Sequence, residues 1–462
     1  MARNGLEVLF LSSEVDPFAK TGGLADVAGS LPIALERKGV LSRLIMPRYR
    51  GVRRYGKEEK IGQSIKVSFI ENDSYFDRDG LYGEKGKDYP DNLERFAFFA
   101  KACLEFLKEK KIRVDLIHCN DWQTALVPVY LKSLYRNDPF FQGVKTVFTI
   151  HNLGYQGLFP KVEFPKTGLD WSYFHMEALE FYDKVNLLKG GLVFSDLLTT
   201  VSPTYSREIQ TREFGYGLEG ILSKRKNDLY GIINGIDIDL YNPEKDKTIK
   251  QNYSAETPER KGANKKDLQE LCGLKVDEGV PLIGMISRLA DQKGFDIFVP
   301  AVEAILKKGF QIVLLGTGDE KYETVLKGIG QKSPDRLSIH LKFDAALAQK
   351  IYAGSDFFMM PSRYEPCGLG QMISLRYGTI PIVRRTGGLA DTIREGDPPA
   401  GNGFVFSDYQ TKELLAATLR AQKVYQNKFA WQKLVRHAMG CDYSWDRSAQ
   451  SYLELYRKVL GR

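Results

Sequence analysis

Two cations in one short segment are suited to binding a diphosphate. Arg288 and Lys293 lie in the stretch 287–294, which follows an apolar β-type run and precedes a helix-period segment. Both side chains can therefore converge on one point at the start of that helix. Two fixed cations there would bind a diphosphate and stabilise the negative charge that develops as it leaves. The alternative is an exposed basic loop with no ligand.

A carboxylate stands in a second such segment, at 361–371. Glu365 lies between residues that restrict the backbone, so its carboxylate is aimed and could accept hydrogen bonds from two sugar hydroxyls. The backbone amides of Gly368 and Leu369 could face a phosphate. Cys367 is expected to be a small packed side chain rather than a nucleophile, because no histidine lies near it in the sequence to promote the thiolate.

A Thr-Gly-Gly turn occurs in each half of the chain. The first combines Lys20 with a threonine and the pair Gly22 and Gly23, directly before a helix-period segment. Glycines let a backbone approach a ligand, the first amides of a helix favour an anion, and the lysine adds a full charge. The second turn contains Thr386 and Gly387 and is expected to face the same substrate. An ordinary strand-to-helix turn is the alternative for the first.

Other polar residues also follow expected strands. His151 comes directly after the β-type run 144–150 and is a candidate for sugar contact, although a single histidine is more often structural. Asp-x-Asp pairs at 77–79 and 237–239 resemble the metal motif of some sugar transferases, but neither clearly follows a buried strand. Two carboxylates alone are a weak magnesium site, and two cations on the diphosphate would make a metal unnecessary. No metal is therefore predicted.

The elements that must position these residues form a regular alternation. Short apolar runs at strand length alternate with segments of helical period, which predicts parallel strands joined by crossover helices. The expected strands are 6–11, 114–119, 144–150, 281–286, 311–315, 337–343, 356–360 and 379–383, and two expected helices lie at 25–38 and 96–107. Ligands of such sheets bind beyond the carboxyl ends of the strands, where all of the candidate residues lie.

A polar segment divides this alternation into two parts. Residues 244–270 are rich in charged residues and asparagine and show no sustained apolar period, so the linker is expected near 243–250. A length of 462 residues also exceeds what one hydrophobic core usually supports, and the 43% hydrophobic content can fill two. We therefore expect an α/β protein with two Rossmann-like, doubly wound domains facing a central cleft.

Composition limits the partners and the compartment. An excess of 66 basic over 58 acidic residues gives a net charge of +8, which suits a small anionic substrate better than nucleic acid. The chain shows no apolar run near the ~20 residues of a membrane span and no signal-peptide pattern. An odd number of cysteines without a CxxC pair disfavours disulfides and zinc, which predicts a cytoplasmic protein; the cysteines are Cys103, Cys119, Cys272, Cys367 and Cys441.

Six motifs taken together resemble the bacterial glycogen synthases and the related starch synthases. They extend from near the N-terminus almost to the C-terminus, in the family's order and spacing: KTGGLADV at 20–27, HN at 151–152, NGID at 234–237, SRLADQKG at 287–294, PSRYEPCGL at 361–369 and RRTGGLADT at 384–392. The resemblance implies a GT-B fold and a metal-independent, retaining transfer of glucose from ADP-glucose to the non-reducing end of an α-1,4-glucan, with no cofactor.

The same resemblance implies domains and residue roles. An acceptor-binding and catalytic domain would span 1–245, a nucleotide-sugar domain 246–444, and a helix at 445–462 would cross back to the first domain. The implied catalytic residues are Lys20, His151, Arg288, Lys293 and Glu365. The implied donor-binding residues are Gly22, Gly23, Asn234, Phe343, Cys367, Gly368, Leu369, Thr386 and Gly387, with Phe343 against the adenine. The implied acceptor-binding residues are Asp26, Asp121 and Asn152.

Some alternatives stay open at this point. Residues 344–346 are Asp-Ala-Ala where many relatives carry a glutamate, so the choice between ADP-glucose and UDP-glucose is less fixed than the phosphate site. Rival interpretations are a GT-B transferase with a lipid or other acceptor and a non-catalytic glucan-binding protein. A nicotinamide oxidoreductase is disfavoured because the Gly-Thr-Gly-Asp stretch at 316–319 lacks the full GxGxxG motif. The sequence does not fix the oligomeric state.

Overall fold

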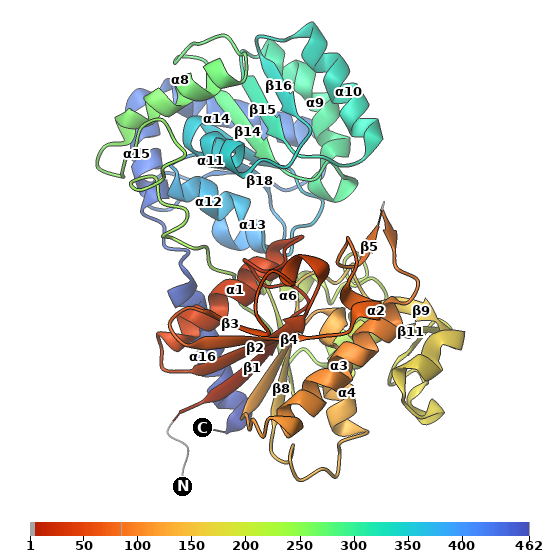
Figure 1. The fold of residues 1–462 in the computed structure, drawn as a ribbon. Coiled ribbons are helices and arrows are strands. Elements are labelled where there is room, and N and C mark those ends of the chain that lie inside the picture. The colour runs from red at the N-terminus through yellow and green to blue at the C-terminus, as the bar shows by residue number, and fades with distance from the viewer. Residues whose placement is uncertain (1–4, 85, 462) are drawn as a thin grey trace. The chain divides into compact units, whose positions relative to one another are not determined.

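The chain folds into two compact units. The computed structural model describes residues 5–84 and 86–461. Unit 1 combines Met1–Gly235 with Trp445–Arg462, and unit 2 is Ile236–Ser444 (Figure 1). The division after Gly235 places residues 236–245 in unit 2, whereas the sequence suggested a boundary at 245. Because unit 1 contains both ends of the chain, unit 2 is an insertion between its last strand and its last helix.

Unit 1 is built on a mainly parallel sheet. In its described residues the sheet has eight strands in the order β13-β12-β8-β7-β1-β2-β4-β3, and only the β3–β4 pair is antiparallel. The strands are β1 (Glu7–Leu11), β2 (Leu41–Pro47), β3 (Glu58–Ile61), β4 (Ile65–Ile70), β7 (Leu116–Asn120), β8 (Lys145–Ile150), β12 (Leu197–Thr200) and β13 (Leu229–Gly231). Smaller antiparallel sheets contain β5 (Gly83–Glu84), β6 (Lys87–Asp88), β9 (Leu158–Pro160), β10 (Glu180–Phe181) and β11 (Lys184–Asn186).

Helices cover both faces of this sheet. Its central strands read as nearly continuous apolar runs, as in β1 (EVLFL), because both faces are buried. In Figure 1, α1 and α16 lie on one side of the sheet and α3 and α4 on the other. The helices of unit 1 are α1 (Gly23–Glu36), α2 (Asp73–Phe76), α3 (Asn92–Glu109), α4 (Leu126–Lys132), α5 (Leu187–Phe194), α6 (Pro203–Glu208), α7 (Glu219–Lys224) and α16 (Trp445–Leu460).

The last helix, α16, is part of the core of unit 1. Its apolar face buries Tyr452 and Tyr456 completely. The Tyr456 hydroxyl lies 2.6 Å from Nδ1 of His118 on β7, and Nε2 of the same ring lies 2.5 Å from Oγ1 of Thr149 on β8. This buried chain of hydrogen bonds fixes the position of α16 against the sheet. Desolvation, with the nearby His151, lowers the pKa of His118 to about 3, so the ring is neutral.

Unit 2 has a second doubly wound sheet. All neighbours are parallel in the order β16-β15-β14-β17-β18-β19. The strands are β14 (Leu282–Ile286), β15 (Gln311–Leu315), β16 (Leu337–His340), β17 (Phe357–Met360), β18 (Ile380–Arg384) and β19 (Phe404–Phe406). The helices are α8 (Lys261–Leu271), α9 (Phe295–Lys307), α10 (Glu320–Lys332), α11 (Ala345–Gly354), α12 (Gly370–Arg376), α13 (Gly387–Thr392), α14 (Thr411–Gln426) and α15 (Lys428–Met439). The predicted pair of doubly wound α/β units is confirmed.

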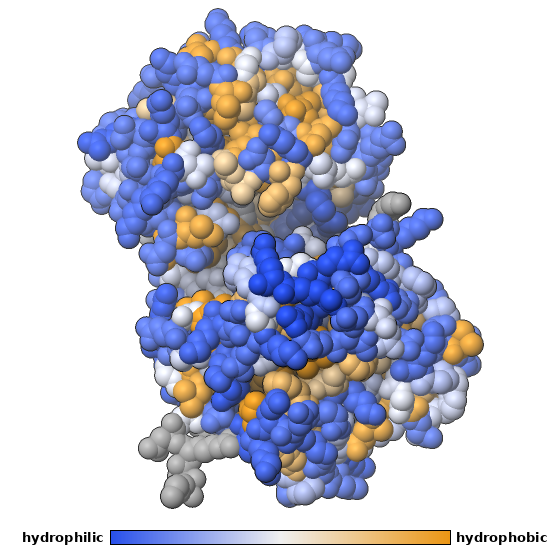
Figure 2. All heavy atoms as spheres, viewed as in Figure 1, coloured by the Kyte–Doolittle hydropathy of each residue, from blue (hydrophilic) through white to orange (hydrophobic). Residues whose placement is uncertain are grey.

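The surface that Figure 2 shows is mainly hydrophilic on both units, with apolar side chains in separate groups. Short 3₁₀ turns, among them Asp291–Lys293 and Trp122–Thr124, occur where strands lead into helices. Among the described residues, no helix combines the length and hydrophobicity that crossing a membrane requires. The polar side chains that bear on function are those at the carboxyl ends of the strands.

Candidate active site

Each sheet has a switch point where the order of its strands reverses. In unit 1 the chain goes from β1 to β2 on one side and later to β7 on the other, and in unit 2 it goes from β14 to β15 and later to β17. A crevice forms beyond the carboxyl ends of the two strands that flank such a point, and ligands of doubly wound sheets bind there. The segments after β1, β7, β14 and β17 contain most of the candidate residues.

In unit 2, an ion pair connects the two sides of the switch point. Lys293, in the 3₁₀ turn Asp291–Lys293 after β14, places its Nζ 2.9 Å from Oε1 and 2.8 Å from Oε2 of Glu365, which follows β17. The hydroxyl of Ser362 donates a third bond to Oε2, at 2.9 Å. The Glu365 side chain is only 7% exposed and that of Lys293 22% exposed. The structure thus fixes the carboxylate while leaving part of the ammonium group accessible.

Two glycine positions allow the segments around Glu365 to approach each other. A Cβ on Gly294 (φ +80°) would lie 2.0 Å from the carbonyl oxygen of Pro361, and one on Gly387 (φ +43°) 2.0 Å from that of Glu365. No side chain fits at either distance, and both φ values favour glycine. The amide of Gly388 also donates to the Glu365 carbonyl, at 3.1 Å. The second Thr-Gly-Gly turn therefore packs directly behind Glu365.

The remaining candidates in unit 2 differ in their surroundings. Arg288 is exposed and reaches Gln292 in the same turn as Lys293, at 3.5 Å. Cys367 is 5% exposed, so it is a packed side chain, and it forms no disulfide. Phe343 is 94% exposed and lies beyond the carboxyl end of β16, outside the Lys293–Glu365 cluster.

Gly368 and Leu369 directly precede the first residue of α12. Gly368 has φ +74°, a left-handed conformation that favours glycine, and Leu369 is the N-cap residue of α12. The side-chain amide of Gln371 donates to the carbonyl oxygens of Cys367 and Gly368 and so fixes the turn. Because α12 has few residues, its amides add to the site only in combination with the neighbouring cations.

In unit 1, a buried carboxylate fixes the loop that contains Lys20. Glu14 is 3% exposed, and its Oε2 accepts from the amides of Thr21 and of Gly22, the latter at 3.2 Å. Its Oε1 accepts from the Thr21 hydroxyl at 2.6 Å and from the Tyr82 hydroxyl at 2.7 Å. Lys20 forms an ion pair with Asp26 in the first turn of α1. The loop is therefore held from inside, with the Lys20 side chain at the surface.

The two Thr-Gly-Gly turns, although alike in sequence, have different environments. A Cβ on Gly22 or Gly23 would meet nothing within 4 Å, and both residues are exposed. A Cβ on Gly388 would lie 2.0 Å from the carbonyl oxygen of Cys367. The first turn thus leaves free space over its backbone, as a ligand-binding turn must, whereas the second serves close packing.

The segments after β7 and β8 form one polar cluster. The Oδ1 of Asp121 accepts from the His151 amide at 2.7 Å, and Nε2 of His151 lies 2.8 Å from Oδ1 of Asn120. Desolvation lowers the pKa of His151 to about 3, so its ring is neutral. Desolvation raises the pKa of Asp121 to about 7, against the amides of His151 and Asn152, which favour the charged form. Asn152 itself accepts from the amide of Gly154.

Asn234 follows β13 at the end of unit 1. It is 5% exposed, and its Oδ1 is buried without a hydrogen-bond partner among the described residues. A buried carbonyl oxygen without a partner is costly, which is a reason to look for a ligand that would satisfy it.

The structure brings the candidates together within each unit in separate groups. Those of unit 1 lie after β1, β7, β8 and β13, and those of unit 2 lie after β14, β17 and β18, with Phe343 apart. The sequence assigned no role to the supporting partners Glu14, Tyr82, Ser362 and Asn120. Glu14 and Ser362 could have been suspected, because each lies within a few residues of a strand end and of a candidate.

The Asp-x-Asp pairs have other partners. Asp77 and Asp79 both form ion pairs with Arg50, whose hydrogen bond lowers the pKa of Asp77. The carboxylate of Asp237 accepts from the amides of Asp239 and Leu240 in a local turn. Within residues 5–84 and 86–461, no group of three or more histidine, cysteine, aspartate or glutamate side chains is arranged to hold a metal ion.

Comparison with known proteins assigns both units. Residues 7–224 match the family described as starch synthase catalytic domain, and residues 280–423 match glycosyl transferases group 1. The glycogen synthases of Geotalea daltonii and Thermotoga maritima are 49% and 48% identical to this chain, each over 99% of both chains.

Solved structures agree with this assignment. The catalytic domain of starch synthase IV from Arabidopsis thaliana, bound to ADP and acarbose, is 36% identical and has a TM-score of 0.91 over 99% of this chain and 100% of its own. A sucrose-phosphate synthase from Thermosynechococcus elongatus is 17% identical with a TM-score of 0.65, which shows the GT-B fold alone. The resemblance inferred from the six motifs is therefore confirmed, and the chain belongs to the glycogen synthase family of GT-B glucosyltransferases.

Proposed function

We propose that this glucosyltransferase moves glucose from ADP-glucose to the non-reducing end of an α-1,4-glucan, with retention of the anomeric configuration. The observation that carries the proposal is the Lys293–Glu365 pair at the switch point of unit 2. It combines a cation for a diphosphate with a buried carboxylate for sugar hydroxyls at the position where doubly wound sheets bind ligands. A non-catalytic glucan-binding protein has no need of a cation for a leaving diphosphate.

The proposed chemistry needs no protein nucleophile. The bond between the anomeric carbon and the diphosphate oxygen breaks, the acceptor hydroxyl oxygen bonds to that carbon, and its proton goes to the leaving phosphate. Arg288 and Lys293 stabilise the charge that develops on the diphosphate, and Lys20 adds a third cation. Glu365 binds the glucose hydroxyls, and Phe343 provides an exposed ring for the adenine.

Sugar recognition on unit 1 is assigned to neutral and weakly acidic groups. The neutral His151 contacts the transferred glucose, and the unpartnered Oδ1 of Asn234 accepts from a hydroxyl there. Asp26, Asp121 and Asn152 form the acceptor side. The free backbone surface of Gly22 and Gly23 gives room for the donor. Unit 1 is thereby the acceptor and catalytic domain, and unit 2 the nucleotide-sugar domain.

We place the enzyme in the cytoplasm, acting on small nucleotide sugars and glucan rather than on nucleic acid. None of the five cysteines forms a disulfide, and four of them are buried, which fits a reducing compartment.

The test is incorporation of labelled glucose into glycogen by the purified chain. ADP-glucose and UDP-glucose are supplied separately, each with a chelator present. Transfer from ADP-glucose, at a rate the chelator leaves unchanged, is the expected result. Preferential use of UDP-glucose would correct the donor, and no transfer from either donor would contradict the proposed reaction.

A further inference from the structure

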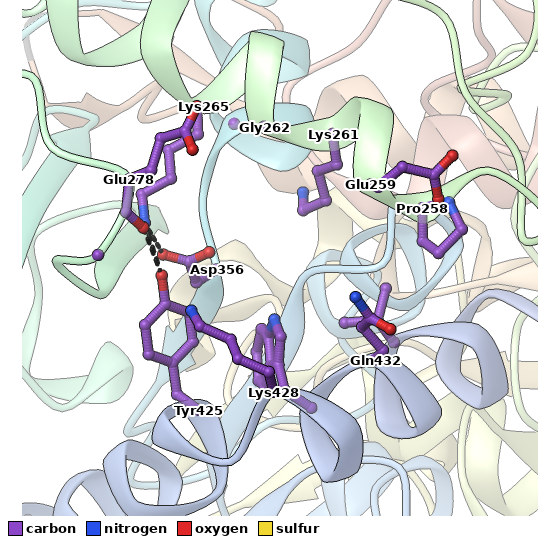
Figure 3. Close-up of a pocket in the computed structure, with 14 residues that line it drawn as sticks. Pro258, Glu259, Lys261, Gly262, Lys265, Glu278, Asp356, Tyr425, Lys428 and Gln432 are labelled. Carbon is purple, nitrogen blue, oxygen red and sulfur yellow. Dashed lines mark hydrogen bonds and ion pairs between the residues drawn. The ribbon is translucent and has the colours of Figure 1, made fainter.

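Unit 2 contains a second pocket, at the opposite end of the strands that position Lys293 and Glu365. We call it the rear pocket. It has a volume of about 470 Å³, within the ~300–1,000 Å³ range of small-molecule sites. Its lining comes from the start of α8, the turn before β14, the residues before β17, and the helices α14 and α15, and includes Glu259, Lys261, Gly262, Lys265, Glu278, Asp356, Tyr425, Lys428, Trp431 and Gln432 (Figure 3).

The rear pocket is separate from the candidate active site. Glu278 and Asp356 precede β14 and β17, whereas Lys293 and Glu365 follow these strands. A strand of four residues spans about 13 Å, so the two sites lie at opposite edges of the same sheet. A ligand of the rear pocket therefore does not compete directly with the donor.

The two buried lysines on the inner wall of the rear pocket already have hydrogen-bond partners within the protein. The ammonium group of Lys261 donates to the carbonyl oxygens of Tyr352 and Ala353 and to the Thr379 hydroxyl, at 3.2, 2.6 and 2.7 Å. Lys265 contacts the carboxylate of Asp356 at 2.7 Å and donates to two carbonyl oxygens and to the Tyr425 hydroxyl. A lysine has three N–H donors, so neither buried lysine has one left for a phosphate.

The groups that are free to bind lie at the rim. Among the described residues, the side chains of Glu259, Glu278, Lys428 and Gln432 have no hydrogen-bond or ion-pair partner, while the Lys428 ammonium lies 4.8 Å from the centre of the Tyr425 ring. Figure 3 shows Gln432 extending from α15 toward the α8 side of the pocket, and Lys428 extending over the Tyr425 ring. The rim therefore offers two anionic hydrogen-bond acceptors, one cationic donor and one side-chain amide that can donate and accept.

This set of groups selects the ligand class. The lining carries three lysines and three carboxylates, and desolvation lowers the pKa of Lys261 to about 7. The pocket therefore has no net positive charge to attract a polyanion, and it has too many polar groups for a purely apolar ligand. A sugar hydroxyl both donates and accepts, as the rim requires. The partly exposed Trp431, whose ring centroid lies 5.1 Å from that of the buried Tyr425, adds aromatic surface for the apolar face of a sugar ring.

We propose that the rear pocket binds a short stretch of α-1,4-glucan, as a second glucan site on the nucleotide-sugar unit. The proposal rests on the proposed function in that it takes the acceptor polymer as the ligand. A branched polymer held at two sites has a higher effective concentration at the active site. A trisaccharide cannot occupy both sites at once. The rear pocket should therefore lower the KM for glycogen and leave the KM for maltotriose unchanged.

The test uses the full chain and a substitution that fills the pocket. Gly262 lies in α8 and lines the pocket, and a Cβ there would meet only the Glu278 carboxylate, at 3.9 Å. Gly262→Trp therefore blocks the rear pocket with little disturbance of α8. The matched control is Gly328→Trp, because Gly328 also lies inside a helix, α10, with nothing within 4 Å of its Cβ, and is not among the residues that line the pocket.

A second variant removes the recognition without filling the pocket. Lys428→Ala/Gln432→Ala changes two exposed side chains of α15 and removes the contact of the Lys428 ammonium with the buried Tyr425 ring. Both pocket variants should raise the KM for glycogen roughly tenfold, with kcat, the KM for ADP-glucose and the KM for maltotriose within twofold of the wild type. The Gly328→Trp control should match the wild type. An unchanged KM for glycogen in both pocket variants would overturn the proposal.

A binding measurement separates this proposal from the transfer reaction. Calorimetric titration of the wild-type chain with maltoheptaose should show a site that Gly262→Trp removes, and this holds whether or not the chain transfers glucose. Titration with inorganic phosphate should give no heat that depends on Gly262. Phosphate binding that Gly262→Trp abolishes, with maltoheptaose binding unchanged, would instead identify an anion site and refute the glucan site.

Discussion

Lys293 and Glu365 form a direct ion pair, with Nζ 2.9 and 2.8 Å from the two carboxylate oxygens, across the β14–β17 switch point. The pair joins two loops that the sequence separates by 72 residues. It also determines how each side chain can act, because the lysine orients the buried carboxylate and the carboxylate keeps the ammonium group near the strand ends. The phosphate-binding and sugar-binding functions proposed for unit 2 are therefore structurally coupled.

Replacing either member of this pair should abolish most transfer. Lys293→Ala and Glu365→Ala are each expected to lower kcat by about 10²–10³, the scale measured for single charge-stabilising groups. Because the two residues act together, the double variant should lose much less than the product of the single effects. Circular dichroism should show all three chains folded. Lys108→Ala is the control, since its pair with Asp138 lies at the surface of unit 1 and should be worth little. A folded double variant with full activity would refute the site.

The Glu14 carboxylate should be needed for donor binding through the loop that it holds. In Glu14→Gln the amide nitrogen cannot accept a hydrogen bond, so part of the contacts to Thr21 and Gly22 is lost. A charge-assisted hydrogen bond contributes roughly 1.5–3 kcal/mol, which corresponds to at least a tenfold change in an equilibrium constant. We expect the KM for ADP-glucose to rise about tenfold and the KM for glycogen to stay constant.

Tyr82→Phe provides the graded comparison for this prediction. It removes one hydrogen bond to Oε1 of Glu14 and leaves the contacts to the loop in place. Its effect on the KM for ADP-glucose should be smaller than that of Glu14→Gln. Equal rises in the KM of donor and acceptor in both variants would point to general destabilisation of unit 1 instead.

The two Thr-Gly-Gly turns should respond differently to the same substitution. Gly388→Ala places a Cβ 2.0 Å from a backbone oxygen and should destabilise unit 2 by about 1–3 kcal/mol, the usual cost of overpacking. Gly23→Ala meets open space at the start of α1 and should leave the melting temperature unchanged while raising the KM for ADP-glucose. Calorimetric melting and donor kinetics on both variants check this. Equal losses of stability would contradict the difference in packing.

The buried His118 should make the unfolding free energy depend on pH. Desolvation, with the nearby His151, lowers its pKa in the folded chain to about 3, from an ordinary value of 6.5. Below pH 6.5 the unfolded chain binds a proton that the folded chain does not, so the stability from this group is present above pH 6.5 and is lost as the pH falls toward 3.

Integrated from pH 7 to pH 5, this one histidine should cost about 1.9 kcal/mol. The measurement is urea denaturation of the wild type and of His118→Gln at several pH values. His118→Gln should be less stable at pH 7, and the difference should shrink by about that amount at pH 5. A constant difference across this range would mean that His118 titrates normally in the folded chain.

Much of the fold could be predicted because most strands are buried on both faces and read as apolar runs. The expected strand at 311–315 coincides with β15, and those at 6–11, 144–150 and 281–286 differ from β1, β8 and β14 by one residue at one end. The strand expected at 337–343 ends at His340, since the chain leaves the sheet before the exposed Phe343. Local hydrophobicity is enough to predict a strand where burial of both of its faces determines the sequence.

The helix α8 could not be predicted for a physical reason. All but its last residue lies in the segment interpreted as lacking an apolar period, and its buried residues include Lys261, Asn264, Lys265 and Gln269. Their polar groups are satisfied by partners far away in the sequence, such as Thr379 for Lys261. A buried face made of lysines and amides carries no hydrophobic signal, so only the tertiary structure reveals it.

The candidate site shows the same distinction. Residue types and spacing were enough to select Lys293 and Glu365, but not to show that they contact each other, because the contact depends on the order of β14 and β17 in the sheet. The two Thr-Gly-Gly turns could not be told apart either, since what distinguishes them is the backbone that faces them. Such differences arise from tertiary contacts, which a local sequence pattern does not contain.

The return of the chain to unit 1 through α16 has a consequence for biosynthesis. The polypeptide leaves unit 1 after Gly235 and re-enters it at Trp445, and Tyr452, Tyr456 and His118 meet in its core. A ribosome therefore delivers every strand of the first sheet, and the whole of unit 2, before the helix that completes the first core. Domains generally fold as units during synthesis, N-terminal ones first. In this chain the inserted unit can finish folding first. Until translation has passed Leu460, the nascent first unit exposes the face of its sheet that α16 later covers.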